Sequence, residues 1–168
     1  MDTPPTGSSW KAHAEKQMNA LETWMAPLFG KAPHLPENIR QGLATIAPWA
    51  ALIFGIIGIL GIFSIFNMLS MFSAIPHNVV IPGIRTMYPV AIVTLVIGGI
   101  ASVLQVLAFK PLQARRKKGW NFLFYANTLS TTTVIINLLL SYGGAIGGVI
   151  GILIGYWLLF EIRGIYRE

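Results

Sequence analysis

Residues 110–120 read KPLQARRKKGW, and this basic segment decides how the rest of the chain is interpreted. It separates two stretches that carry no charged side chain, residues 86–109 and 119–160, and a third such stretch covers residues 41–84. A helix needs about 20 apolar residues to cross the hydrocarbon core of a bilayer. Residues 41–84 and 86–109 have room for one span each and residues 119–160 for two, so the sequence predicts four membrane helices.

The basic residues lie outside the predicted spans. Of the 12 Lys and Arg side chains, all but Arg85 precede the first span, lie between the second and third, or follow the fourth. Cytoplasmic loops of membrane proteins collect Lys and Arg. The distribution therefore predicts an integral protein of the cell (inner or cytoplasmic) membrane, with both termini in the cytoplasm.

The predicted fold class is all-α, an integral membrane four-helix bundle of two antiparallel hairpins, preceded by an amphipathic cytoplasmic helix. Prolines are expected to keep the outside loop non-helical and, at Lys110-Pro111, to end the second span. The spans are expected at residues 47–72, 90–109, 120–140 and 144–160. The other segments are a disordered tail (1–9), an interfacial helix (10–29), a linker (30–46), an outside loop (73–89), a basic cytoplasmic loop (110–119), an outside turn (141–143) and a cytoplasmic C-terminus (161–168).

Composition agrees with a membrane protein and points to lipid as a partner. The chain is 54% hydrophobic and 11% charged, whereas about 25% of residues are charged in an average soluble domain. Because the basic residues flank apolar spans, the net charge of +6 is better explained by contact with anionic headgroups than by nucleic-acid binding. The residues expected to contact headgroups are Lys110, Arg115, Arg116, Lys117, Lys118, Trp10 and Trp24.

The N-terminal segment has the spacing of an amphipathic helix. Its apolar residues recur every three or four positions, which places them on one helix face: Trp10, Ala14, Met18, Leu21, Met25 and Leu28. One interpretation is a helix that lies in the headgroup region with its tryptophans as anchors. The other is a helix docked on its own protein or on a second copy.

The fourth predicted span carries closely spaced glycines that favour tight helix contact. Small residues four apart share one helix face and let another backbone approach closely. The partner could be a helix of the same chain or a second copy in a homo-oligomer or another membrane protein. The residues of this packing face are Gly143, Gly144, Gly147, Gly148, Gly151 and Gly155.

The third predicted span is the most polar. Asn127, Ser130, Asn137 and Ser141 are spaced so that they share one helix face. Side chains of this kind need hydrogen-bond partners in lipid. They therefore predict either polar contacts between helices or the lining of a path for a small solute.

No constellation for catalysis is apparent. The interior of each predicted span lacks ionisable side chains, which mark ion and proton pathways in membranes, and the chain contains no cysteine. The three histidines are scattered, so no metal site, cofactor or enzyme activity is predicted. Glu161 and Arg163 are interpreted as an interface anchor, and Trp49, Trp120 and Trp157 as aromatic belt residues.

The expected function is accordingly that of a packing, scaffolding or accessory membrane component. The alternative is a subunit of a small-solute transporter or channel, with its polar path along the third span.

Overall fold

The structure is a computed structural model that describes residues 9–29, 34–73, 84–139 and 145–166. The chain divides into two compact units, residues 1–35 and residues 36–168. The first unit contains α1 (Ser9–Phe29), and the second contains the remaining helices.

Helix α1 covers the segment for which the sequence predicts a helix at residues 10–29. Pro27 lies in its last turn, where it removes one hydrogen bond near the helix end. The hydroxyl of Thr23 donates to the carbonyl of Asn19, one turn earlier, at 2.8 Å. The expected tail at residues 1–9 lies almost entirely outside the described residues.

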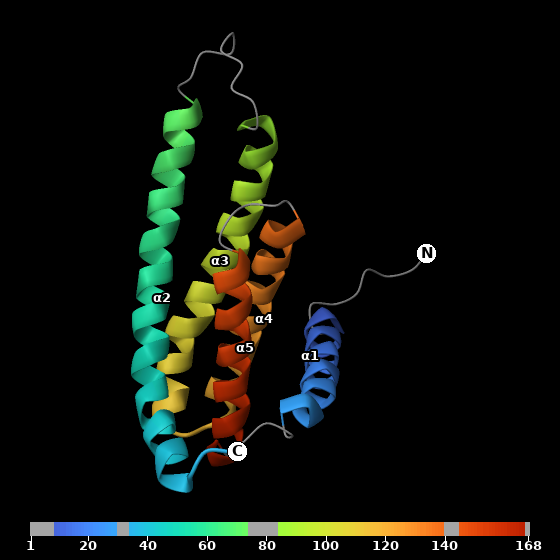
Figure 1. The fold of residues 1–168 in the computed structure, drawn as a ribbon, viewed down its shortest axis with the longest axis vertical. Helices are drawn as coiled ribbons and strands as arrows, with labels where there is room; N and C mark the ends of the chain where they lie inside the picture. The colour runs from blue at the N-terminus through green and yellow to red at the C-terminus, as the bar shows by residue number, and fades with distance from the viewer. Residues whose placement is uncertain (1–8, 30–33, 74–83, 140–144, 167–168) are drawn as a thin grey trace. The chain divides into compact units, whose positions relative to one another are not determined.

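The second unit is a bundle of four long helices that run alongside one another (Figure 1). They are α2 (Glu37–Ser73), α3 (Ile84–Gln113), α4 (Lys117–Leu139) and α5 (Ala145–Ile162), and a short 3₁₀ turn, η1 (Arg163–Ile165), follows α5. Helix α2 packs on α3, α3 on α4, and α4 on α5, and α5 also contacts α2. No strand is present in the described parts of the chain, so the all-α prediction is confirmed at this level.

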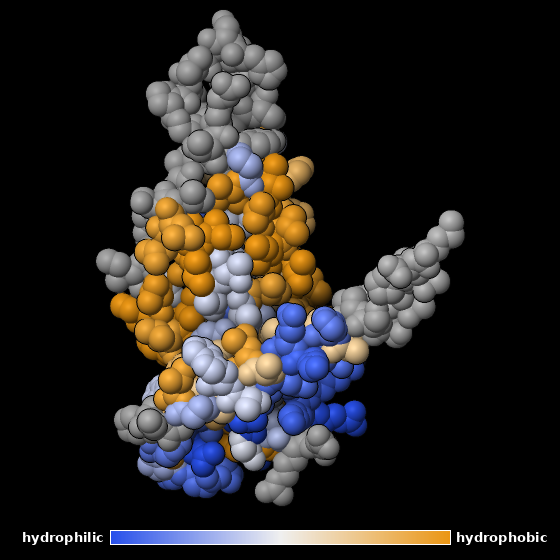
Figure 2. Space-filling model, turned by 90° about the vertical axis from the view of Figure 1, so that its right-hand side faces the viewer, coloured by the Kyte–Doolittle hydropathy of each residue, from blue (hydrophilic) through white to orange (hydrophobic). Residues whose placement is uncertain are grey.

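Each of the four long helices is long and apolar enough to cross a membrane. The candidate spans are Glu37–Met71, Pro89–Gln113, Lys117–Leu139 and Gly147–Ile165. On the face shown in Figure 2, hydrophobic residues cover much of the described part of the bundle. Large apolar side chains such as Phe54, Phe63 and Phe66 are more than 60% exposed on the surface of α2. These features indicate a membrane protein.

Helix α2 begins ten residues earlier than the predicted span at 47–72, so most of the predicted linker at 30–46 is helical. Its first turn forms on the carbonyl of Pro36, which accepts from the amides of Ile39 and Arg40 at 3.0 and 3.1 Å. Glu37 then accepts from Arg40 and Gln41 along the helix surface. Pro48, expected near the first turn of the span, therefore lies inside a continuous helix.

Helix α3 is also longer than predicted at both ends. It begins at Ile84, so the prediction that prolines keep residues 73–89 non-helical is wrong for residues 84–89. It continues through Pro111 to Gln113, so Lys110-Pro111 does not end it. A proline removes one amide donor, and at a helix end this loss interrupts little of the hydrogen-bond ladder.

The predicted basic loop at 110–119 shrinks to a tight turn of three residues, because α4 begins at Lys117, three residues before the expected span at 120–140. Helix α5 ends at Ile162, two residues beyond the expected end of the span at 144–160. The expected outside turn at 141–143 lies outside the described residues, and so do residues 74–83 of the expected outside loop at 73–89.

The best-packed part of the bundle lies at the end where α2 begins, α3 turns into α4, and α5 finishes. We call this the basic end, because it carries Arg40, Lys110, Arg163 and the basic residues 115–118. The largest fully buried side chains of the described chain, Trp120, Phe124 and Leu112, belong to it. Among the described residues, the opposite end contributes none to this group.

Candidate functional site at the basic end of the bundle

The turn between α3 and α4 is a helix C-cap of the Schellman type. The amide of Arg116 donates to the carbonyl of Pro111 at 2.9 Å, and the amide of Arg115 donates to the carbonyl of Leu112 at 3.0 Å. This pair of bonds requires a left-handed residue at the position of Arg115, where glycine is usual. Arg115 indeed has a φ of 50°, a conformation that costs about 1 kcal/mol or more for a residue with a side chain.

The close approach of α4 to this turn depends on Gly119. A Cβ at Gly119 would lie 2.6 Å from the backbone nitrogen of Leu112 and 2.9 Å from its Cγ. Any side chain there would push the start of α4 away from the end of α3. Gly119 and Trp120, which close the KPLQARRKKGW segment, are therefore both packed inside the bundle.

Trp120 joins α4 to α5 and does not face lipid as a belt residue would. Its indole Nε1 donates to the carbonyl of Leu159 at 2.7 Å, and only 1% of the residue is exposed. Its ring stacks on Phe124 at 5.3 Å between centroids and meets Phe160 edge-on at 5.8 Å. The guanidinium of Arg163 lies 5.7 Å above it, within the range of a cation–π contact.

Arg40 joins the start of α2 to the end of α5. Its Nε donates to the backbone carbonyl of Glu161 at 3.0 Å and lies 3.4 Å from the carboxylate Oε1 of the same residue. The side chain of Glu161 is 3% exposed, so its charge is balanced within the protein. The predicted role of Glu161 as an interface anchor is replaced by a buried connection between helices.

Tyr166 makes a second contact between the end of the chain and α2. It bonds to the backbone carbonyl that Pro48 leaves without a helical partner. In an α-helix the carbonyl of residue 44 accepts from the amide of residue 48, and proline has no such amide. The hydroxyl of Tyr166 donates to the Ala44 carbonyl at 3.1 Å instead. Burial raises the pKa of Tyr166 to about 12, although the positive charge of Arg115 lowers it in part.

A partly polar pocket of about 340 Å³ lies beside the turn, between α2 and the end of α3. Arg115 of the turn, Gln113 of α3 and Trp49 of α2 are among its lining residues, and Trp49 meets Phe109 edge-on at 5.2 Å. The full lining is Ala44, Thr45, Pro48, Trp49, Leu112, Gln113 and Arg115.

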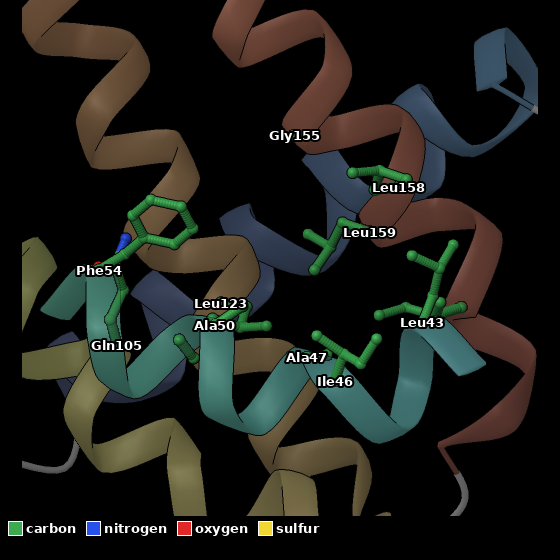
Figure 3. Close-up of a pocket in the computed structure, with 12 residues that line it drawn as sticks. Leu43, Ile46, Ala47, Ala50, Phe54, Gln105, Leu123, Gly155, Leu158 and Leu159 are labelled. Carbon is green, nitrogen blue, oxygen red and sulfur yellow. The ribbon is translucent and has the colours of Figure 1, made fainter. Parts of the chain in front are cut away.

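An apolar groove of about 220 Å³ lies on another side of α2, between α2 and α5 (Figure 3). Leu158 and Leu159 of α5 and Phe54 of α2 are among its lining residues, and Gln105 of α3 supplies a polar side chain. None of the described residues that line it has an ionisable side chain.

The other predicted headgroup residues differ in their surroundings. Lys110, Arg116, Lys117 and Lys118 are exposed at the basic end, and the Lys118 ammonium lies 5.7 Å from the centroid of the Phe122 ring. In the first unit Trp24 is 66% exposed, and Trp10 lies in the first turn of α1.

The polar side chains of α4 bond mainly to their own helix and to α5. The hydroxyls of Thr128, Ser130 and Thr131 each donate to the carbonyl four residues earlier, and the Asn137 amide donates to the carbonyl of Thr133 at 3.0 Å. The hydroxyl of Tyr156 on α5 donates to Thr128 at 3.1 Å. Ser141 lies outside the described residues.

Asn127 packs against a glycine of α5. A Cβ at Gly155 would lie 3.1 Å from the Asn127 Oδ1. The buried Nδ2 of the same amide is without a hydrogen-bond partner among the described residues. The close contact between α4 and α5 at this point therefore depends on the missing side chain of Gly155.

The glycines of α5 divide into two groups. A Cβ at Gly148 would lie 3.0 Å from Val134, so Gly148, like Gly155, faces α4. A Cβ at Gly147 or Gly151 would meet no atom of the described residues within 4 Å, so these two glycines lie on the open side of the helix. Gly143 and Gly144 lie outside the described residues.

Two glycines that lie outside the predicted packing face make closer contacts than the glycines of α5. A Cβ at Gly55 of α2 would lie 2.7 Å from Val106 and 3.0 Å from the Ser102 carbonyl, and one at Gly58 would overlap the Ser102 hydroxyl. The spacing of Gly55 and Gly58 in the sequence could have identified them as helix-packing residues. The roles of Tyr166 and Arg40, in contrast, depend on partners more than 120 residues away.

No protein-family model matches the chain, and neither does any curated protein or solved structure.

Proposed function

We propose that the chain is a non-catalytic structural component of the cytoplasmic membrane, which it crosses four times, with both termini and the basic end in the cytoplasm. The bundle acts as a scaffold that presents the basic end and the N-terminal helix to anionic lipids and to a membrane partner. The charge distribution supports this orientation, because Lys and Arg concentrate on the cytoplasmic side of membrane proteins. The proposed arrangement is two antiparallel hairpins.

The observation that carries the proposal is the use made of the polar side chains. Arg40 and Tyr166 each connect α2 to the chain at the end of α5, more than 120 residues away, and Trp120 and Tyr156 each connect α4 to α5. Polar groups that are hydrogen-bonded within the protein stabilise a single arrangement of the helices and offer few free donors or acceptors to a solute. A scaffold needs such a fixed arrangement.

The alternative, a transporter or channel subunit with a path along α4, is favoured by two buried polar atoms of that helix. The Asn127 Nδ2 and the Asn121 Oδ1 have no hydrogen-bond partner among the described residues. The hydroxyls beside Asn127 bond to the backbone of their own helix, as is common for threonine in membrane helices.

Proteoliposome swelling separates the two functions. Vesicles with and without the protein are mixed with glycerol, urea or potassium chloride, and the variant Asn127→Leu with Asn137→Leu is measured beside the wild type. We expect no protein-dependent permeation in any case, and a lower thermal stability of the double variant. Permeation by the wild type that the double variant abolishes while it remains folded would refute the scaffold and favour transport.

The proposal gives α1 an interfacial position. Its apolar residues, including Met18, Leu21 and Met25, follow a helical spacing, and a helix with one apolar face lies in the headgroup region with that face towards the acyl chains. A spin label on Trp24→Cys of the full chain, which has no other cysteine, reports the depth of this face in phosphatidylglycerol vesicles. Quenching by water-soluble reagents alone would instead favour a helix docked on protein.

A further inference from the structure

We infer that the pocket beside the α3–α4 turn binds the phosphate of an anionic phospholipid headgroup, with the Arg115 guanidinium as its principal ligand. The inference rests on the proposed function, because it requires the basic end to face an anionic leaflet. It goes further by separating one arginine with a built pocket from the neighbouring basic residues, which contribute charge alone.

The backbone at Arg115 is the first observation. The Schellman turn needs a left-handed residue at this position, and arginine adopts that conformation with a φ of 50°, although glycine would adopt it without strain. Glycine is abundant in this chain, which contains 17 of them, and one lies only four residues away at Gly119. Strain kept at one residue is often associated with a function of its side chain.

The second observation concerns the charges around Arg115. In the part of the chain that the structure describes, its guanidinium has no hydrogen bond or ion pair, whereas Arg40 is paired with Glu37 and Glu161. The Tyr166 hydroxyl, which is close enough to feel the charge of Arg115, is uncharged below its pKa, which burial raises to about 12. The positive charge of Arg115 is therefore available to a ligand.

The pocket itself has the composition that a lipid headgroup requires. Its buried lining residues, Ala44, Pro48 and Leu112, are apolar, and its exposed lining residues include Arg115, Gln113 and Trp49, whose side chains carry hydrogen-bond donors. It lies where the candidate span of α3 ends at Gln113, which is the depth at which a phosphodiester joins the hydrocarbon region. A volume of about 340 Å³ is within the range of small-ligand sites.

Arginine is suited to this ligand. Its planar guanidinium donates two parallel hydrogen bonds to a phosphate, which an ammonium group does not. The phosphate of a soluble phosphomonoester has the same chemistry, but the apolar buried lining and the position at the end of a span favour the lipid. We therefore commit to a glycerophospholipid such as phosphatidylglycerol.

The test compares thermal unfolding of the full chain in neutral detergent micelles during titration with phosphatidylglycerol, phosphatidylcholine or free glycerol phosphate. Arg115→Gly is the informative variant, because it removes the guanidinium and also relieves the backbone. Arg116→Ala is the matched control, since it removes the same charge from the adjacent exposed residue, which does not line the pocket. Arg115→Lys keeps the charge but not the paired donors.

We expect phosphatidylglycerol to stabilise the wild type and to bind Arg115→Gly at least tenfold more weakly, although this variant is as stable as the wild type or more stable without lipid. Arg116→Ala should bind less than threefold more weakly, and Arg115→Lys should fall between the two. Loss of stability in Arg115→Gly without lipid would overturn the premise that the left-handed position is strained.

Three other results would overturn the inference in distinguishable ways. Equal weakening by Arg115→Gly and Arg116→Ala would mean that only the summed charge of the basic end matters, and the proposed function would survive. Equal stabilisation by free glycerol phosphate would assign the pocket to a soluble ligand. Equal stabilisation by phosphatidylglycerol and phosphatidylcholine would rule out a site for an anionic headgroup. Cysteine labelling at Gln113 would then show separately whether the basic end faces the cytoplasm.

Discussion

The bond between Tyr166 and the Ala44 carbonyl explains how a proline is accommodated inside the longest helix of the bundle. Pro48 supplies no amide to that carbonyl, and the Tyr166 hydroxyl replaces it at 3.1 Å in a buried position. Tyr166→Phe removes only the hydroxyl. It leaves the ring in place and the carbonyl of Ala44, a residue that is 2% exposed, without a donor.

The expected cost follows from that burial. A buried acceptor that loses its partner costs about 1–3 kcal/mol, so we expect Tyr166→Phe to lower the free energy of unfolding in mixed micelles by that amount. In a Pro48→Ala background the new amide of residue 48 can donate to the same carbonyl. The same Tyr166→Phe change should then cost about 0.5 kcal/mol or less.

The four proteins form a double-mutant cycle, and the interaction between the two positions is the quantity to measure. Unfolding is followed by helical circular dichroism in one detergent at one pH, and each variant is first checked for a native helix content. An equal cost of Tyr166→Phe in both backgrounds would refute the explanation that the hydroxyl compensates for the proline.

Three further predictions concern the same bundle. Raising the pH from 10 to 12 should destabilise the wild type more than Tyr166→Phe. The pKa of Tyr166 is raised from 10.0 to about 12 in the folded state, so between these values the folded state keeps a proton that the unfolded state releases. The stability present below pH 10 is therefore lost as the pH rises. Parallel pH profiles would contradict this. Arg40→Ala should lower the free energy of unfolding by about 2 kcal/mol more in the wild type than in a Glu161→Gln background, because it leaves a buried carboxylate without its cation. Thermal unfolding of the wild type, the two single variants and the double variant checks this difference. Gly155→Ile should lower stability by about 1–3 kcal/mol through overlap with the neighbouring amide, whereas Gly151→Ile, on the open face, should fold normally and lose any oligomer seen by native mass measurement. Normal folding and assembly of both variants would remove α5 as a packing face.

The four apolar helices could be predicted from the sequence because they depend on local composition alone. Stretches without charge are long enough to cross a bilayer, and each candidate span of the described residues lies largely within one of them. The helix ends are harder to predict. Pro48 is typical of a helix start, but a tyrosine at the other end of the chain satisfies the carbonyl it leaves free, and no local pattern contains that information.

The candidate site, too, could be predicted from the sequence only in part. The basic residues at 115–118 and the glycine at 119 are evident in the sequence, and their charge and position predict contact with headgroups. The left-handed conformation of Arg115 depends on the turn between α3 and α4. The burial of Trp120 against the Leu159 carbonyl depends on how α4 and α5 pack. Spacing alone also ranks the glycines of α5 above Gly55 and Gly58, which make the closer contacts.

The orientation of the chain in the membrane is the claim on which the proposed scaffold and the lipid pocket both depend. Because the chain has no cysteine, single cysteines introduced at Lys16, Pro82, Gln113 and Glu168 can be labelled with an impermeant maleimide in intact and in permeabilised cells. We expect labelling of intact cells at Pro82→Cys alone, and of all four variants after permeabilisation. Labelling of intact cells at Gln113→Cys would place the basic end outside and contradict the proposed orientation.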